Sequence, residues 1–292
     1  MSPVVIPVGE EGVKRIAILR SERDVAVARD DAVAVEEPLE IQLSFEKRGI
    51  RATKSVSVTM RTPGHDRELA AGFLFTEGII DGGAAIEGWE LPESARSGPA
   101  GGNSLRAVLR DGVAVDLRAL ERHFYTTSSC GVCGKTSLEA LRVTGRIALE
   151  PDRPVWDSSR IGDLPQVLRS GQAIFEATGG LHAAGLFDAD GALVAVREDV
   201  GRHNAVDKLV GAQVLAGRVP LAGHLLLVSG RASFELVQKA VMAGIPVLAS
   251  VGAPSSLAVD VARQFGATLL GFVARGRFNV YAGAQRIRFP AP

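Results

Sequence analysis

Cysteine is scarce in this sequence, and net charge is absent. The 292 residues contain only two cysteines, Cys130 and Cys133, which are too few and too close together for a disulfide framework. We therefore expect a reducing, cytoplasmic environment. The 33 basic and 33 acidic side chains balance. A general nucleic-acid binder normally has a basic excess, so no nucleic-acid partner is expected.

Long hydrophobic runs are also missing. The longest, at residues 225–228 and 245–251, are far too short to cross a bilayer, so we expect no membrane association. Residues 1–10 contain no basic region followed by an apolar core, which argues against a secretory signal. The 46% hydrophobic and 23% charged residues are typical of a globular protein with a packed core.

The first half of the chain predicts a lead-in at residues 1–37 and a small α+β domain at residues 38–150. Hydrophobic residues alternate with period two on both sides of a turn at residues 47–49, and a helical spacing follows Asp66, which is suited to cap a helix. The predicted elements are a strand near 15–19, a hairpin with strands at 39–43 and 56–60, a helix at 66–74, a loop at 81–103, and a second hairpin with strands at 105–109 and 113–117.

Residues 151–292 predict an α/β domain in which strands and helices alternate. Such alternation is typical of a largely parallel sheet with helices on both faces. The predicted helices lie at residues 166–177, 204–215, 233–243 and 256–265. The predicted strands are a hairpin at 184–187 and 192–197, followed by strands at 225–228, 246–251 and 268–273.

Both cysteines lie in one loop of small residues, and a glycine follows each of them. Residues 136–139 match a capping box, so the cysteines precede a helix N-terminus, which together with Lys135 favours a thiolate. Such a loop is suited to carry a reactive sulfur, with which the second thiol can exchange. Three alternatives stay open: a redox pair, although the flanking pattern is unlike thioredoxin; a zinc site completed by histidines from elsewhere; and two cysteines without function.

Three predicted strand-to-helix turns, at residues 198–204, 229–233 and 252–256, combine glycine with polar side chains. In open α/β sheets, ligands bind beyond the carboxyl ends of the strands, where helix N-termini offer N–H groups to phosphates. Arg202 and Arg231 add positive charge of the right geometry, so the turns predict a site for a nucleotide or diphosphate. The alternative is that the polar residues only cap helices and the arginines are solvated.

A fourth segment, residues 271–279, follows the last predicted strand. Arg275 and Arg277 alternate there with apolar residues around a glycine, which suits them to hold phosphate while Phe272 or Phe278 packs on a base. A plain surface strand end is the alternative. His182 and His65 also lie in glycine-containing turns, and neither receives a role from the sequence.

Taken together, the motifs resemble those of the FdhD family, the formate dehydrogenase accessory sulfurtransferases. The resemblance runs from about residue 36 to residue 285, and several motifs occur in one order. The matching segments are residues 62–69, 130–134, 178–184, 198–208, 229–235 and 277–281.

The resemblance implies a function that spacing alone does not predict. Family members accept sulfur from a cysteine desulfurase as a cysteine persulfide and pass it to molybdenum bis(molybdopterin guanine dinucleotide) before this cofactor enters formate dehydrogenase. It also implies a homodimer and a cytidine deaminase-like three-layer α/β/α domain beside the smaller α+β domain. Cys130 is then the persulfide-bearing residue and Cys133 its partner, with GDP as a mimic of the nucleotide arms. The expected cofactor-binding residues are Phe272, Val273, Ala274, Arg275, Gly276, Arg277, Arg202, His203 and Arg231.

Three other functions compete with this hypothesis. A zinc deaminase is disfavoured, because the turn at His203 lacks the glutamate of that enzyme class and the next turn lacks its cysteines. A non-catalytic chaperone for the molybdenum cofactor would keep the nucleotide site but need no reactive thiol. A zinc-stabilised binding module would hold a metal, which the leading hypothesis does not expect.

Overall fold

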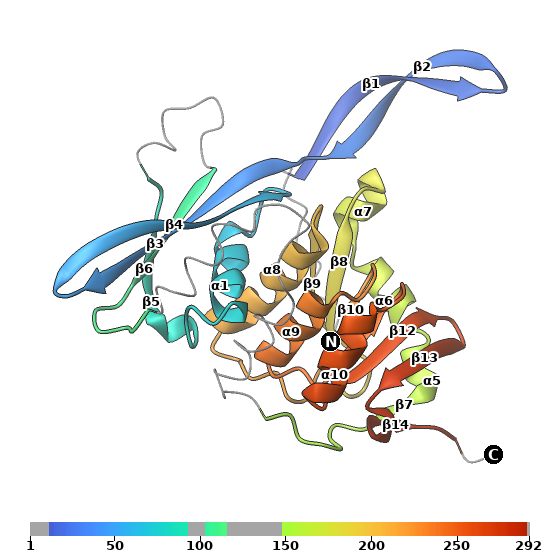
Figure 1. Ribbon diagram of the computed structural model, residues 1–292. Coiled ribbons are helices and arrows are strands. Elements are labelled where there is room, and N and C mark those ends of the chain that lie inside the picture. Colours follow the sequence, from blue (N-terminus) through green and yellow to red (C-terminus); the bar gives the residue numbers. More distant parts are fainter. Residues whose placement is uncertain (1–11, 93–102, 116–147, 291–292) are drawn as a thin grey trace.

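The computed structural model describes residues 12–92, 103–115 and 148–290 (Figure 1). The cysteine loop and the second strand of the predicted 105–117 hairpin from residue 116 onward lie outside these ranges. No helix within them is both long and apolar enough to traverse a bilayer.

The N-terminal region forms an antiparallel hairpin, where only one strand near residues 15–19 was predicted. Its strands are β1 (Val13–Glu22) and β2 (Val25–Ala34), which pair from Val13 opposite Ala34 to Glu22 opposite Val25. The turn residues Arg23 and Asp24 both have positive φ, 49° and 66°, a conformation that usually calls for asparagine or glycine. The absence of that signal explains why the sequence did not reveal the hairpin.

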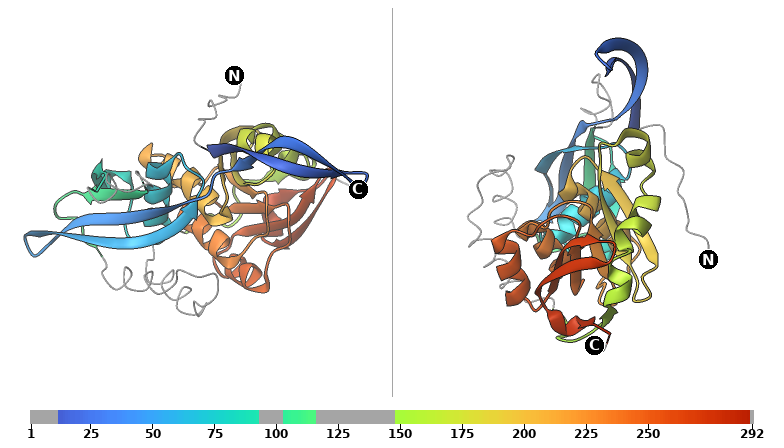
Figure 2. Two further views of the ribbon diagram at one scale, coloured as in Figure 1. Left: turned by 90° about the horizontal axis from the view of Figure 1, so that it is seen from above. Right: turned by 90° about the vertical axis from the view of Figure 1, so that its right-hand side faces the viewer.

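A four-stranded sheet with the order β4-β3-β6-β5 follows. The predicted hairpin is confirmed as β3 (Glu37–Lys47) and β4 (Ile50–Arg61), and the predicted helix as α1 (Asp66–Thr76). Figure 2 shows that the β3–β4 and β1–β2 hairpins extend in opposite directions.

Two predictions for this region were wrong. The predicted loop 81–103 contains a 3-10 turn (Gly83–Ala85) and a strand, β5 (Ile86–Glu90), which Gly88 and a β-bulge obscure in the sequence. The strand β6 (Ser104–Leu109) is where it was expected, but residues 113–115 are not a strand. β6 instead pairs with β3 in parallel and with β5 in antiparallel orientation, so its partners come from distant parts of the chain.

The second sheet has six strands in the order β13-β12-β11-β10-β8-β9. Only the pairs β10–β11 and β11–β12 are parallel, so the prediction of a largely parallel sheet was wrong. The cause is that antiparallel strands continue the sheet on both sides. β13 pairs with β12 on one side, and β8 and β9 follow β10 on the other. The strands are β8 (His182–Phe187), β9 (Leu193–Asp199), β10 (Leu225–Val228), β11 (Val247–Ser250), β12 (Thr268–Ala274) and β13 (Arg277–Ala282).

Helices cover both faces of this sheet, which confirms a three-layer α/β/α arrangement (Figure 2). One core joins alternate strand residues to α8 (Arg202–Leu215), α9 (Phe234–Met242) and α10 (Ser256–Gln264). The other joins the opposite strand faces to α5 (Ser158–Ile161) and α6 (Leu164–Ser170). The likeness to cytidine deaminase stays a prediction.

Smaller elements complete the fold. The helix predicted at residues 166–177 is in fact two, α6 and α7 (Ala173–Thr178), separated at Gly171. A Cβ at Gly171 would lie 3.1 Å from Leu193 and 3.2 Å from Val196, so the chain bends where it touches the sheet. α7 packs against the N-terminal hairpin, and the short strands β7 (Trp156–Asp157) and β14 (Ile287–Arg288), the latter preceded by a 3-10 turn (Ala284–Arg286), pair near the C-terminus.

Helices α1 and α8 lie in contact along their length and join the two predicted domains. Their backbones approach at two glycines: a Cβ at Gly72 would lie 1.8 Å from the carbonyl oxygen of Asp207, and one at Gly211 would lie 1.8 Å from that of Glu68. One hydrophobic core therefore includes residues of both helices and both sheets. The division of the chain near residue 150 stays a prediction.

We predict that Gly211→Ala lowers the free energy of unfolding by at least about 2 kcal/mol, because the added methyl group forces α1 and α8 apart. Urea denaturation measures the change. Gly223→Ala is the matched control, since a Cβ there meets nothing within 4 Å. Equal midpoints for the two variants would show that the close helix contact does not exist.

Candidate functional site at the carboxyl edge

The strands β10, β11 and β12 end at one edge of the six-stranded sheet, and we call this edge, with the loops at residues 229–233 and 251–255, the carboxyl edge. Backbone hydrogen bonds connect the loops: Gly252 N–H donates to Gly230 C=O at 3.0 Å, and Phe272 N–H donates to Gly252 C=O at 3.2 Å. Arg231 and Phe272 are thereby brought to the same edge, although about 40 residues separate them in the chain.

Phe272 takes an unusual backbone conformation at this edge. Its φ is 53°, in the left-handed region that costs a residue with a side chain about 1–2 kcal/mol, and its side chain is 46% exposed. The strain coincides with a β-bulge between Gly271 and Ala274, where Gly271 lies so close to Pro254 that a Cβ would be 2.8 Å from its ring. The bulge turns an aromatic ring towards solvent, and strain of this kind is common at binding sites.

The other residues predicted in this segment occupy different environments. Val273 is 1% exposed and its side chain packs in the second core. Arg275 and Arg277 are exposed on the β12–β13 turn, which also holds Ala274 and Gly276. The backbone of this turn lies against Gly162, where a Cβ would be 2.9 Å from the Gly276 nitrogen.

Arg202 and His203 begin helix α8 beside the carboxyl edge. The Nε2 atom of His203 lies 3.2 Å from the hydroxyl of Ser233 and 3.4 Å from a carboxylate oxygen of Glu235. The contact with His203 and the hydroxyl of Ser233 lower the pKa of Glu235 to about 2, against the opposing effect of burial. Glu235 is therefore ionised and committed to His203 at neutral pH.

His182 joins this cluster, although no role for it follows from the sequence alone. It opens β8 opposite Asp199 of β9, and a Cβ at Gly230 would lie 3.3 Å from its Nδ1 atom. Burial lowers the pKa of His182, and the positive charges of Arg202 and His203 lower it further, against the opposing effect of Asp199. The available signal was its position at the start of a strand, after a glycine pair.

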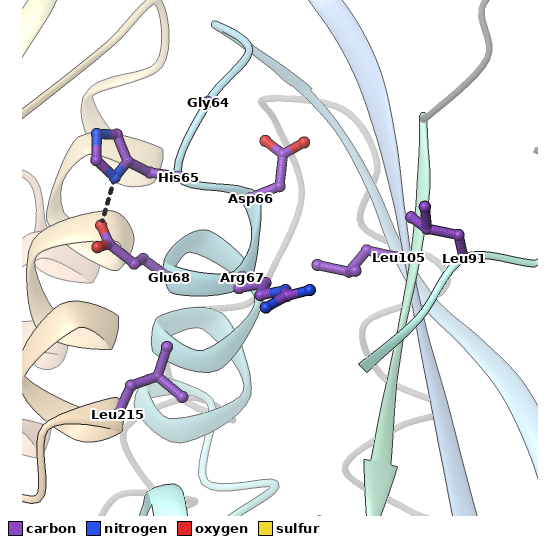
Figure 3. Close-up of a pocket in the computed structure, with 8 residues that line it drawn as sticks. All are labelled: Gly64, His65, Asp66, Arg67, Glu68, Leu91, Leu105 and Leu215. Atoms are coloured by element: carbon purple, nitrogen blue, oxygen red, sulfur yellow. Dashed lines mark ion pairs between the residues drawn. The ribbon is translucent and has the colours of Figure 1, made fainter. Parts of the chain in front are cut away.

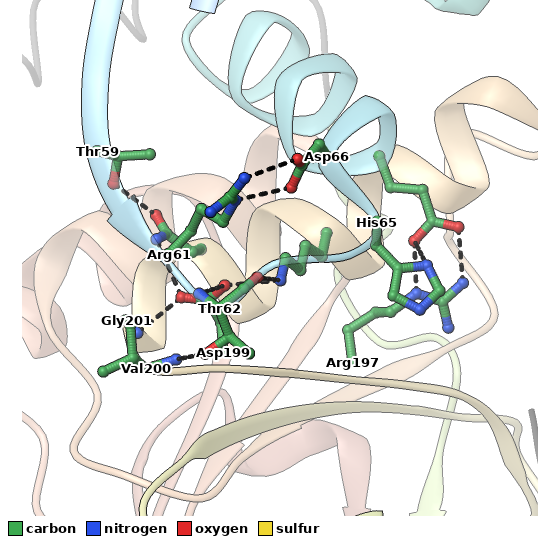
Figure 4. Close-up of polar contacts among 12 residues, drawn as sticks. Thr59, Arg61, Thr62, His65, Asp66, Arg197, Asp199, Val200 and Gly201 are labelled. Carbon is green, nitrogen blue, oxygen red and sulfur yellow. Dashed lines mark hydrogen bonds and ion pairs between the residues drawn. The ribbon is translucent and has the colours of Figure 1, made fainter. Parts of the chain in front are cut away.

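Asp199 fixes the turn that carries Arg202 and His203. Its carboxylate forms an ion pair with the Lys208 ammonium at 2.7 Å and accepts hydrogen bonds from the Gly201 N–H at 2.8 Å, the Asn204 amide at 3.0 Å and the Thr62 N–H at 3.2 Å (Figure 4). Asp199 and Lys208 are almost completely buried. These partners occupy the carboxylate of Asp199, which therefore has a structural role: it holds the turn in place.

The 62–69 motif joins α1 to the second sheet, and its first residue, Thr62, contacts Asp199 and Val200 beside the carboxyl edge. Arg61 binds Asp66 through two hydrogen bonds, and Arg197 binds Glu68 through two more (Figure 4). His65, at a φ of 60°, contacts Glu68 at 3.1 Å. These side chains hold elements together, so the motif is mainly structural.

A pocket of about 510 Å³ lies beside this motif (Figure 3). Its lining consists of Gly64, His65, Asp66, Arg67, Glu68, Leu91, Leu105 and Leu215. These residues include none of the predicted site residues, so the pocket and the carboxyl edge are separate features. Cys130 and Cys133 lie outside the described residues.

Comparisons with known proteins agree with the motif pattern. A model of the FdhD/NarQ family matches residues 34–288. A protein named sulfur carrier protein FdhD from Streptomyces avermitilis is 52% identical over 274 residues, covering 92% of this chain and 94% of that protein. One of the same name from Mycobacterium tuberculosis is 48% identical over 268 residues, covering 90% of this chain and 94% of that protein.

A solved structure shares the fold. The crystal structure of a protein described as a putative formate dehydrogenase accessory protein, from Desulfotalea psychrophila, superposes with a TM-score of 0.68 at 24% identity. The superposition covers 94% of this chain and 98% of that one. At this level of identity the likeness shows the fold alone.

The Glu68–Arg197 pair generates a prediction about acid stability. Burial alone would raise the pKa of Glu68, but the hydrogen bonds and charge of Arg197, helped by His65, lower it from 4.5 to about 2. A lowered pKa stabilises the fold above pH 4.5, and this contribution of about 3 kcal/mol is lost as the pH falls towards 2. Urea denaturation should therefore show the native protein and Glu68→Gln converging in stability between pH 4.5 and 2. Parallel pH profiles would contradict the role of this pair.

Proposed function

Because this chain belongs to the FdhD/NarQ family, we propose that it is a sulfur carrier for the maturation of formate dehydrogenase. It accepts sulfur from a cysteine desulfurase as a persulfide on Cys130 and delivers it to molybdenum bis(molybdopterin guanine dinucleotide), its substrate. The observation that carries this proposal is the near-complete match to sulfur carrier proteins at about 50% identity. A cytoplasmic location and a homodimer belong to the same proposal.

Loading the sulfur and relaying it between the two cysteines require only thiol–persulfide exchange. The thiolate of Cys130 attacks the outer sulfur of the desulfurase persulfide, a new S–S bond forms, and the desulfurase cysteine leaves as a thiolate. No net oxidation occurs. Cys133 can accept the same sulfur from Cys130 by an identical exchange.

The carboxyl edge is the proposed site for the guanine nucleotide arms of the substrate. Phe272 offers an exposed aromatic ring to a base. Arg202 and Arg231, with His203, bring positive charge beside the N-termini of α8 and α9, where backbone N–H groups suit phosphate oxygens. Arg275 and Arg277 add two exposed guanidinium groups on the adjoining β12–β13 turn.

The persulfide is tested by the intact mass of the protein after incubation with a cysteine desulfurase and cysteine. We predict the addition of sulfur to the native chain and to Cys133→Ala, and none to Cys130→Ala. A persistent adduct on Cys130→Ala would refute its assignment. Full formate dehydrogenase activity in cells whose protein lacks both cysteines would instead favour a chaperone that binds the cofactor without carrying sulfur.

The nucleotide site is tested by calorimetry with GDP. The double variant Arg275→Ala/Arg277→Ala should bind GDP at least about tenfold more weakly, because charged hydrogen bonds contribute about 1.5–3 kcal/mol each. The matched control is Arg20→Ala/Arg29→Ala, which removes the same charge from half-exposed positions on the N-terminal hairpin. Equal affinity in the two double variants would place the nucleotide elsewhere.

A further inference from the structure

Three cationic or protonatable side chains converge beside the carboxyl edge: His182 from β8, and Arg202 and His203 from α8. Electrostatic coupling links them, since the charges of Arg202 and His203 both act on His182. Around them lie the loop at Gly230, Arg231 and Ser233, and the first turn of α9 with Glu235. Ser229 lies directly after β10, next to this loop, and its hydroxyl accepts a hydrogen bond from the Ala183 N–H at 2.8 Å.

The carboxylates near this cluster are already committed to other partners. Asp199 accepts three hydrogen bonds and forms an ion pair with the buried ammonium of Lys208. Glu235 is held by His203. Arg202 forms no ion pair within the described part of the chain, and its Nε atom is buried without a hydrogen-bond partner there. Among the described residues, the positive charge of Arg202 is therefore not balanced by a protein anion.

We propose that His182, Arg202 and His203 form a binding cluster for a phosphate group, and that His182 takes up a proton when the phosphate binds. The phosphate supplies the counter-charge that the surrounding described residues do not offer. This inference rests on the proposed function in one respect, since the natural ligand would be a phosphate of the substrate's nucleotide arm. It adds His182 to the binding residues and makes the affinity depend on pH.

The direction of the pH dependence follows from the charges. In the free protein, burial and its two cationic neighbours hold the pKa of His182 below its usual 6.5, so the imidazole is neutral at pH 7.5. A bound dianion reverses the local field and raises that pKa. The gain in affinity is complete below the pKa of the free state and is lost as the pH rises through the pKa of the complex. If binding raises the pKa of His182 by about one, the affinity changes about tenfold across this range.

The experiment is calorimetry of the full-length protein with GDP and with pyrophosphate, in pairs of buffers that differ in ionisation enthalpy. The number of protons taken up follows from the difference between the two buffers. Inorganic sulfate is a third probe, because its charge stays constant over the pH range of the titration. The native chain should take up protons with all three anions and bind sulfate up to about tenfold more tightly at about pH 5 than at about pH 8.

Two matched variants isolate the cluster. His182→Gln should remove most of the proton uptake and flatten the pH dependence of sulfate affinity. His224→Gln is the matched control, because His224 directly precedes β10 and so lies at the end of that strand away from the carboxyl edge. This variant should behave as the native chain. Arg202→Gln should weaken sulfate binding at every pH, since its charge does not titrate in this range.

The outcomes separate this inference from the proposed function. GDP binding with the same proton uptake in His182→Gln as in the native chain overturns the inference and leaves the sulfur-carrier proposal intact. Pyrophosphate binding with His182-dependent uptake, but no GDP binding, supports the cluster and counts against a nucleotide site. If none of the three anions binds, the cluster is not a phosphate site.

Discussion

The close contact between α1 and α8 is the constraint on which the rest of this structure depends. Gly72 and Gly211 bring the two helix backbones together. Two buried ion pairs involve α8: Lys208 with Asp199 of β9 at 2.7 Å, and Asp207 with Lys239 of α9 at 2.9 Å. Burying such charges is costly unless further hydrogen bonds satisfy them. Here Thr62 C=O accepts from Lys208, and the Thr76 hydroxyl and Glu77 contact Lys239, so both pairs are anchored to the first half of the chain.

The family motifs divide into two groups with different roles. The first consists of residues 62–69 together with Asp199, Asp207 and Lys208, and it builds the joint between the two sheets. Glu198 is also structural, but within the second half of the chain: it accepts hydrogen bonds from the N–H groups of Phe175 and Ile174 in the first turn of α7 at 2.8 and 3.0 Å. The second consists of His182, Arg202, His203 and Arg231, which lie at or beside the carboxyl edge together with Phe272. Asp199 connects the groups, because the carboxylate that anchors α8 also sets the position of Arg202 and His203.

Local patterns in the sequence predicted much of the fold, but they did not predict how the strands pair. The helices α1, α8, α9 and α10 and the strands β8 to β12 have a clear period, so the sequence located them. The mixed sheet was missed although β13 follows β12 across a tight turn, because residues 271–279 were interpreted as a phosphate-binding segment and not as a hairpin. The site followed the same rule: the turns at Arg202 and Arg231 were expected at one sheet edge, where the structure has them. The structural role of Glu68 was hidden, because its partner Arg197 is 129 residues away.

The nucleotide end of the substrate is proposed to bind at the carboxyl edge, while residues 62–69 hold the fold together. Amide hydrogen exchange followed by mass spectrometry, with and without GDP, tests this division most directly. We predict slower exchange at residues 200–205, 229–235, 252–256 and 271–277, and unchanged exchange at residues 64–68 and 86–91. Protection confined to the residues beside the α1 pocket, with none at the carboxyl edge, would contradict it.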